Sequence, residues 1–251
     1  MNDRAKPSVI TAEMQNAKVL ALLEDPALQE LTSTVSPVLP DDWPAGATPK
    51  TTEGPYYLSF GQSLLRSDIT EDRKGVPLTL RYTVVDAVTQ APVKGARVDT
   101  WHCDAFGYYS GYLSHDPDTF PGSEALSHIE PSDESRFLRG SQYTDESGGV
   151  EFGTVYPGWY HNRDVHIHMK VYVDDREVYV GQLHMPDDVN DIVGTLPPYD
   201  GHITLERLAN DEDLLYQSDN GQDLVPDVRP VSEGNPEIGF IAAFTLAVVT
   251  S

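Results

Sequence analysis

The sequence is poor in cysteine and in long apolar runs. Cys103 is the single cysteine of the 251 residues, so no disulfide can form within one chain. Low cysteine use is typical of a reducing compartment, and we expect a cytoplasmic protein. The chain has no run of about 18 apolar residues, and its start lacks the apolar segment of a secretory signal. We therefore expect neither a membrane-spanning helix nor a secretory signal.

Basic residues are also scarce. The sequence has 17 Lys and Arg against 40 Asp and Glu, which gives a formal net charge of −23 at pH 7. A surface this acidic repels nucleic-acid phosphates and anionic membranes, so neither is an expected partner. Hydrophobic residues make up 39% of the chain, an ordinary share for a globular protein. The length suffices for one large domain or two small ones.

The first 50 residues differ from the rest. Met14, Ala17, Leu20, Ala21 and Leu23 recur at helical spacing and predict a helix over residues 11–34. The proline-rich stretch 35–50 predicts a linker. We therefore divide the chain into an N-terminal helix and linker arm, residues 1–50, and a main domain, residues 51–251.

Residues 51–251 show the patterns of β-strands. Apolar and polar residues alternate over 78–85, 150–156 and 165–173, and apolar stretches at 96–101, 178–185 and 238–249 predict further strands. Strands at this spacing, separated by Gly, Asp and Pro turns, indicate a mainly β protein, an antiparallel β-sandwich. The stretches 103–140 and 184–235 are expected to be long loops, which in a compact domain are usually functional.

The segment "GWYHNRDVHIHMK", residues 158–170, concentrates polar side chains that bind metals. In a strand, His166 and His168 face the same side. An H-x-H pattern alone fits a polar strand face as well as a metal site. Tyr160 precedes it, and upstream "WHCDAFGYYSGY" places two tyrosines, Tyr108 and Tyr109, after a glycine. Phenolate oxygen is a hard anionic donor that suits Fe(III).

Several motifs in order identify a family resemblance. "TTEGPYYL", "WHCDAFGYYS", "RGSQYTDESGGVEFGTVYPGWY", "RDVHIHMKV" and "GQLHMP" resemble the intradiol ring-cleavage dioxygenases, which include the catechol, hydroxyquinol and protocatechuate enzymes. The resemblance covers roughly residues 50–250 and implies a β-sandwich that carries a non-haem Fe(III).

The resemblance also implies roles for individual residues. The metal ligands would be Tyr109, Tyr160, His166 and His168. Arg163 would stabilise negative charge on the reacting substrate, and Tyr160 would leave the metal and take a substrate proton. Substrate-binding residues would be Gly54, Pro55, Tyr56 and Gln182.

Other polar residues receive no role in the chemistry. His102 is expected to be structural, Cys103 to be a packing residue, and His115, His128 and His184 have no partner pattern. His161 lies between Tyr160 and Arg163 but is not expected to be a ligand.

The implied reaction cleaves a catecholic ring between its two hydroxylated carbons. Both atoms of O2 enter the product, a cis,cis-muconate-type diacid. Catechol, hydroxyquinol, protocatechuate and substituted catechols all stay open as substrates, because the loop before His166 is short. The short N-terminal region leaves the quaternary structure open as well, and a homodimer is compatible with the sequence.

Three other classes of protein fit the sequence less well. A transthyretin-like or carbohydrate-binding β-sandwich module would suit "VVDAVTQAPVKGARVD" but gives no reason for two tyrosines to accompany the H-x-H strand. An Fe(II) extradiol-type or cupin oxygenase would need two histidines and a carboxylate. An α/β-hydrolase would need a G-x-S-x-G motif, which the sequence lacks.

Overall fold

The computed structural model describes residues 46–59, 61–119 and 128–250. Its strands are β1 (Pro77–Asp86), β2 (Arg97–Trp101), β3 (Arg139–Tyr143), β4 (Gly149–Val155), β5 (His166–Val173), β6 (Arg176–His184), β7 (Asp227–Pro230) and β8 (Phe240–Val248). Its α-helices are α3 (Asp187–Gly194) and α4 (Leu214–Ser218). Short 3-10 helices cover Gly61–Leu64, Tyr199–Gly201, Asn210–Glu212, Gly221–Leu224 and Pro236–Ile238. The helix predicted over residues 11–34 lies outside the described residues.

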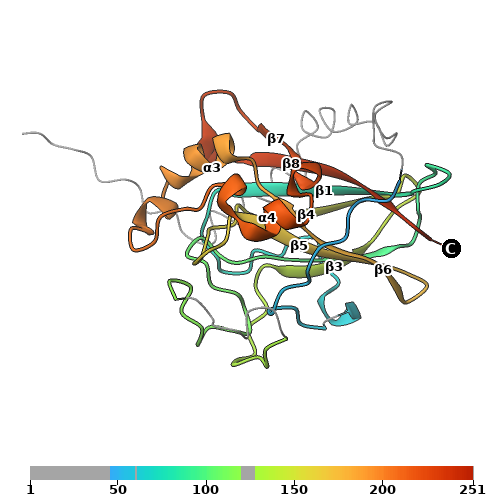
Figure 1. Cartoon of the computed structure of the whole chain (residues 1–251), viewed down its shortest axis with the longest axis horizontal. Coiled ribbons are helices and arrows are strands. Elements are labelled where there is room, and N and C mark those ends of the chain that lie inside the picture. Colours follow the sequence, from blue (N-terminus) through green and yellow to red (C-terminus); the bar gives the residue numbers. More distant parts are fainter. Residues whose placement is uncertain (1–45, 60, 120–127, 251) are drawn as a thin grey trace, which may run out of the picture.

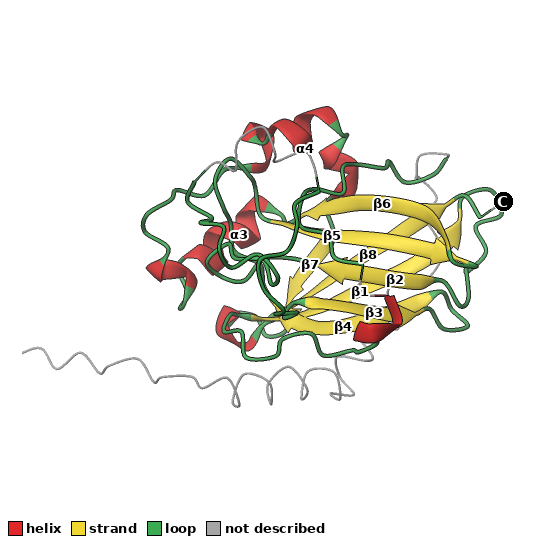
Figure 2. Cartoon of the chain, turned by 90° about the horizontal axis from the view of Figure 1, so that it is seen from below, coloured by secondary structure: helices red, strands yellow, loops and turns green. Residues whose placement is uncertain are grey.

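The strands form two four-stranded sheets, in the orders β4-β1-β8-β7 and β3-β2-β5-β6. Figure 2 shows them as two stacked layers, with α3, α4 and long loops gathered at one end and the C-terminus at the other. The predicted β-sandwich is therefore confirmed. Among the paired strands of the described chain, β1 and β8 run parallel and the other pairs are antiparallel.

The core lies between the two layers. Leu78, Leu80 and Val84 of β1 have no exposed surface, and neither have Ile167 and Met169 of β5. Side chains alternate along a strand, so the neighbours of Ile167 and Met169 point away from this core. That outer face of the β3-β2-β5-β6 sheet carries His166 and His168.

Two loop regions bury the outer face. A second apolar cluster lies there, built from Tyr56, Tyr57, Leu58, Trp101, Cys103, Tyr109, Tyr112 and Tyr160. These residues come from segments that are far apart in the sequence. The polar face of β5 is thus an interior surface between the sheet and its loops.

The prediction that 184–235 is a loop was wrong in part. The helices α3 and α4 and the strand β7 lie within it, and Figure 1 shows both helices at the same end of the molecule. Asp213 starts α4, because its carboxylate accepts the backbone N–H groups of Leu215 and Tyr216. Both helices are short, so helical periodicity had little length over which to emerge.

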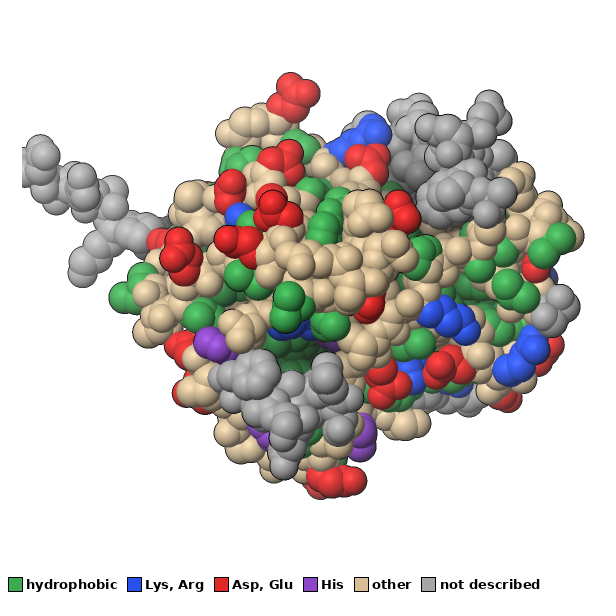
Figure 3. Space-filling model, viewed as in Figure 1, with side chains coloured by type: hydrophobic (Ala, Val, Ile, Leu, Met, Phe, Trp, Pro, Cys, Tyr) green, Lys and Arg blue, Asp and Glu red, His purple; other side chains and the backbone are tan. Residues whose placement is uncertain are grey.

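Among the described residues, no helix is both long and apolar enough to cross a membrane. Figure 3 shows acidic side chains gathered over the helical end of one face. Asp188, Asp191, Asp211 and Glu212 are exposed there, in α3 and just before α4.

Candidate metal centre

The loop after β2 presents Tyr109. Asp104 closes this loop, because its carboxylate accepts the N–H groups of Phe106 (3.0 Å) and Tyr108 (3.1 Å). Fully buried Arg139 then donates from Nε to Ser110 Oγ and from a terminal nitrogen to the Ser110 carbonyl, each at 2.8 Å. These contacts fix the backbone on both sides of Tyr109.

The turn that carries Tyr160 packs directly on this loop. Gly107 has φ +87°, and a Cβ there would lie 2.5 Å from the Trp159 carbonyl oxygen and 3.0 Å from Tyr160 Cβ. A glycine is therefore needed both for the left-handed backbone and for the close approach. The result is that Tyr109 and Tyr160 come from different loops but face one another, with ring centroids 5.7 Å apart.

The histidines lie at the N-terminal end of β5, as its first and third residues. His168 pairs in register with Trp101 of β2 and Gln182 of β6, and His166 pairs with His184 of β6. Backbone pairing holds His168 on both sides and His166 on the β6 side. Their rings lie 4.8 Å apart, at 78° to each other.

The four predicted ligands meet at one point. Tyr109 Oη lies 2.9 Å from His168 Nε2 and 3.4 Å from His166 Nε2, and Tyr160 Oη lies 2.9 Å from His166 Nε2. Each of the four side chains is at most 8% exposed. We call Tyr109, Tyr160, His166 and His168 the donor cluster.

Burial keeps the donor cluster uncharged. Desolvation raises the pKa of Tyr109 and of Tyr160 above the ordinary tyrosine value, so both are neutral phenols near pH 7. Desolvation likewise lowers the pKa of His166 and of His168, so both imidazoles are neutral. Two neutral imidazoles and two phenols that can each release a proton form a site able to receive a highly charged cation.

The orientation of His166 fits this use. Its Nδ1 donates to the Asp164 carbonyl oxygen at 2.8 Å, which leaves the lone pair on Nε2. That lone pair faces both tyrosine hydroxyls. A histidine whose far nitrogen donates to a carbonyl is the usual arrangement for a metal ligand.

His168 is held by packing. The ring of Trp101 stacks on it, with centroids 5.0 Å apart and planes within 9°. Gly54, at φ +77°, covers it from the loop side, where an added Cβ would lie 3.0 Å from His168 Cε1. The predicted pocket residue Gly54 therefore contacts a donor, and Trp101 fixes the plane of the ring.

Arg163 lies beside the donor cluster. One terminal nitrogen, Nη1, is 3.3 Å from both Tyr160 Oη and His166 Nε2, and the other, Nη2, donates to Gln182 Oε1 at 2.5 Å. Burial alone would disfavour the charged guanidinium, but Tyr160, Asp213 and Asp164 together raise the pKa of Arg163 above its ordinary value. Arg163 is therefore a fixed cation next to the site.

The predicted substrate-binding residues surround the same place. Tyr56 stacks on Tyr109 with ring centroids 4.7 Å apart, and Pro55 is buried next to it. Both polar atoms of the Gln182 side-chain amide are hydrogen-bonded: Oε1 accepts from Arg163, and Nε2 donates to the Thr52 carbonyl at 2.9 Å. The cavity beside Tyr56, Tyr109 and Tyr160 has a volume of about 10 Å³. Aromatic side chains thus fill most of the space next to the donor cluster.

Sequence reasoning missed several residues of this region. His115 and Tyr112 line the cavity beside Tyr109. Two successive turns connect these residues, in which the Tyr112 N–H donates to the Tyr109 carbonyl and the His115 N–H donates to the Tyr112 carbonyl. His184, for which the sequence shows no partner pattern, contacts through Nδ1 the fully buried carboxylate of Asp164, which also lies 3.2 Å from His166 Nδ1. The spacing of the two turns could have suggested His115, but nothing in the sequence pairs His184 with Asp164.

Two other residues that received no chemical role, His102 and Cys103, are buried. His102 is buried, with its ring nitrogens 2.8 Å from the Cys103 carbonyl and from Thr154 Oγ1, and burial lowers the pKa of His102 to about 4. Cys103 is buried as well. In the described part of the chain, no three His, Cys, Asp or Glu side chains gather as metal ligands, so the two-histidine, one-carboxylate arrangement is not found there.

Comparison with known proteins gives the class. A family model described as "Dioxygenase" matches residues 52–198, more than half of the chain. The solved structure of an intradiol ring-cleavage dioxygenase from Tetranychus urticae is 31% identical, with a TM-score of 0.72, and the match covers 81% of this chain and 94% of that one. The chain belongs to the intradiol ring-cleavage dioxygenase family.

Two more distant relatives bear on the extent of this match. Catechol 1,2-dioxygenase from Acinetobacter baylyi is 28% identical over 165 residues, or 57% of this chain and 47% of that protein. The match thus spans about half the length of this curated relative. The structure of hydroxyquinol 1,2-dioxygenase from Pseudomonas putida is 17% identical with a TM-score of 0.54, covers 95% of this chain and 76% of that one, and supports the fold alone.

Proposed function

We propose that this protein is a non-haem Fe(III) dioxygenase that cleaves a catecholic ring between its two hydroxylated carbons. The observation that carries the proposal is the donor cluster, in which two buried phenols and two buried imidazoles lie within hydrogen-bond distance of one another. Membership in the intradiol family supports it.

The donor cluster suits ferric iron by its chemistry. Tyr109 and Tyr160 would bind as phenolates, which are hard oxygen donors, and His166 and His168 would bind through Nε2. Burial opposes the phenolate charge, so a trivalent cation is needed to stabilise it. When bound, the ferric ion would hold the catechol as its dianion and activate it toward O2.

Tyr160 is proposed to accept a proton from the substrate. Burial raises the pKa of Tyr160, so its phenolate would be a strong base for a catechol proton. Nη1 of Arg163 contacts this oxygen, Tyr160 Oη, at 3.3 Å. The same guanidinium can stabilise negative charge that develops on the reacting ring.

The pocket residues Gly54, Pro55, Tyr56 and Gln182 are proposed to shape the substrate site. The ring of Tyr56 stacks on Tyr109 and lines the adjacent cavity, so it would form one wall of the substrate site. Gln182 acts through Arg163, since its Oε1 holds one guanidinium nitrogen. The protein's partners in this account are a small catechol and O2, and a homodimer stays a prediction.

The acidity of the protein favours uncharged catechols. Asp116 lines the cavity, and the net charge is −23, so a substrate carboxylate would approach against repulsion. Catechol, the substrate in the name of the Acinetobacter baylyi relative, carries no carboxylate. We propose catechol, hydroxyquinol or a neutral substituted catechol ahead of protocatechuate.

Oxygen uptake by the iron-loaded protein tests this function. We expect O2 consumption with neutral catechols, a muconate-type diacid as product, and kcat/KM for catechol at least about tenfold above that for protocatechuate, a difference of about 1.4 kcal/mol. A faster reaction with protocatechuate would contradict the substrate preference. A protein that binds no iron and consumes no O2 would favour the non-catalytic β-sandwich module, and a semialdehyde product would favour extradiol cleavage.

A further inference from the structure

We propose that Asp213 is a positioning residue, which holds the guanidinium of Arg163 against the donor cluster from the segment between α3 and α4. The inference rests on the role proposed above for Arg163. It concerns a residue beyond the segment 52–198 that matches the family model.

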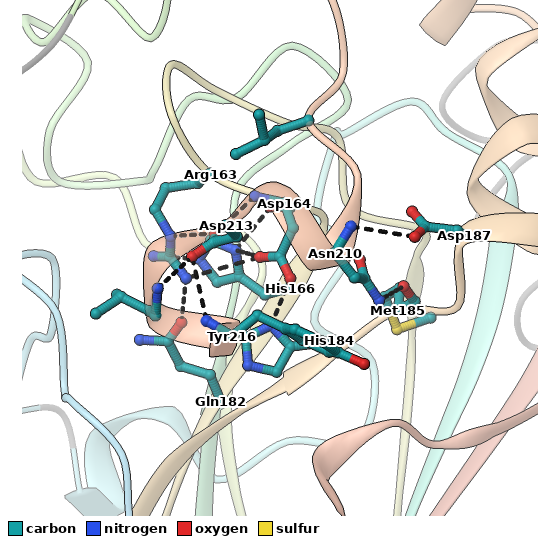
Figure 4. Close-up of polar contacts among 12 residues, drawn as sticks. Arg163, Asp164, His166, Gln182, His184, Met185, Asp187, Asn210, Asp213 and Tyr216 are labelled. Carbon is teal, nitrogen blue, oxygen red and sulfur yellow. Dashed lines mark hydrogen bonds and ion pairs between the residues drawn. The ribbon is translucent and has the colours of Figure 1, made fainter. Parts of the chain in front are cut away.

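The carboxylate of Asp213 is completely enclosed. The residue has no exposed surface, and four donors satisfy its two oxygens. Oδ1 accepts the N–H groups of Leu215 (2.7 Å) and Tyr216 (3.3 Å), and Oδ2 accepts the Asp164 N–H and Arg163 Nε, each at 2.8 Å. Figure 4 shows Asp213 at the centre of these contacts. One carboxylate therefore caps α4 and binds Arg163 at the same time.

Two contacts determine how the planar guanidinium lies. Nε is held by Asp213, and Nη2 is held by Gln182 Oε1 at 2.5 Å. With these two nitrogens fixed, the third, Nη1, is the one that faces Tyr160 Oη and His166 Nε2. The planar guanidinium cannot keep this orientation if either hydrogen bond, to Asp213 or to Gln182, is lost.

Asp164 offers Arg163 a longer contact than Asp213 does. Asp164 Oδ1 is 3.7 Å from Arg163 Nη2, beyond hydrogen-bond distance, while the same carboxylate contacts His184 Nδ1 and His166 Nδ1. Loss of the Asp213 charge would therefore leave Arg163 without its nearest counter-charge. A displaced guanidinium would turn toward Asp164 and away from the donor cluster.

The loop that carries Asp213 is itself anchored. Asn210 donates from its side chain to the Met185 carbonyl at 3.0 Å, and its N–H donates to Asp187 Oδ2 at 3.1 Å. Met185 directly follows β6, and Asp187 begins α3. Figure 4 shows Asn210 next to Met185 and Asp187. The anchor fixes the distance between Asp213 and the sheet that carries Gln182.

Asp213→Asn is the informative substitution. Asparagine caps helices as well as aspartate does, so α4 should persist while the charge is lost. We expect kcat for catechol to fall about 10- to 100-fold, as for other displaced catalytic groups, with unchanged iron content and a retained ferric absorption band. In an Arg163→Gln background the same substitution should have almost no further effect on kcat, because Asp213 acts through Arg163. Equal effects of Asp213→Asn in both backgrounds would overturn the proposal.

A second readout needs no catalysis. In metal-free, 15N-labelled protein, the Nε–Hε resonance of Arg163, assigned by its loss in Arg163→Gln, should be sharp in wild type and shifted or broadened in Asp213→Asn. The matched control is Asp211→Asn, an exposed residue two positions earlier, which should leave the resonance and kcat unchanged. An unshifted Arg163 resonance in Asp213→Asn would overturn the inference, even if wild type turned over no catechol and the proposed function failed.

Folding of the variant is checked by circular dichroism. If Asp213→Asn does not fold, Asp213→Glu takes its place, since it retains the charge but moves the carboxylate by one methylene. It should also shift the Arg163 resonance and lower kcat. Wild-type values for both would contradict a positioning role.

Discussion

Tyr109→Phe is expected to remove much of the visible absorption of the iron-loaded protein and to lower kcat at least about 100-fold, or about 2.7 kcal/mol. Phenylalanine keeps the ring that stacks on Tyr56 but lacks the oxygen that lies 2.9 Å from His168 Nε2. The absorption is expected to arise from charge transfer between tyrosinate and Fe(III). Iron content, the visible spectrum and O2 uptake of the purified variant measure the effect.

A matched control separates a lost donor from a damaged fold. Tyr82→Phe removes a hydroxyl inside the core, on β1 of the opposite sheet, that contacts Thr100 Oγ1 at 3.1 Å; Thr100 in turn donates to the backbone carbonyl of His168 and not to its imidazole. Each variant should lose only about 1 kcal/mol of stability, as is typical for one hydrogen bond. The colour should persist in Tyr82→Phe. Unchanged colour in both Tyr109→Phe and Tyr160→Phe would show that the ligand assignment is wrong.

Arg163→Gln is expected to lower kcat about 100-fold while the protein still binds iron and keeps its ferric band. The guanidinium is not one of the four donors, but its Nη1 lies 3.3 Å from Tyr160 Oη, where charge changes during turnover. Arg163→Lys should have an intermediate effect, because a lysine keeps the charge but cannot hold Asp213 and Gln182 together. Steady-state O2 uptake with catechol measures both.

Stability must be measured beside activity for these variants. The substitution leaves Asp213 buried without its cation, and breaking such a pair can cost about 3–5 kcal/mol. Turnover is therefore measured well below the unfolding midpoint, and exposed Arg229→Gln serves as the surface control. An Arg163→Gln protein that is folded, iron-loaded and as fast as wild type would refute the proposed role of Arg163.

The strands were predictable because their patterns are long and regular. The alternation over 78–85 and 165–173 corresponds to β1 and β5, and it identified the face of β5 that carries His166 and His168. Order along the chain could not reveal that β1 pairs in parallel with β8, because that contact joins segments about 160 residues apart. The short helices α3 and α4 gave too few turns to be recognised.

The site was predictable as far as its motifs extend. The residues Tyr109, Tyr160, His166, His168 and Arg163 lie in short motifs, and the structure brings them together. The supporting contacts were not predictable, because each joins positions with no common pattern: Asp213 with Arg163, 50 residues apart, and His184 with Asp164. Such contacts depend on how loops pack over a sheet, which the periodicity of one strand does not determine.

The most direct test of the central claim is turnover of catechol by the iron-loaded protein under 18O2, with the product identified by mass spectrometry. The account predicts a cis,cis-muconate-type diacid that carries heavy oxygen from O2 in each of its two carboxyl groups. An unlabelled product, a semialdehyde, or no product from fully iron-loaded protein would contradict intradiol ring cleavage at the site formed by Tyr109, Tyr160, His166 and His168.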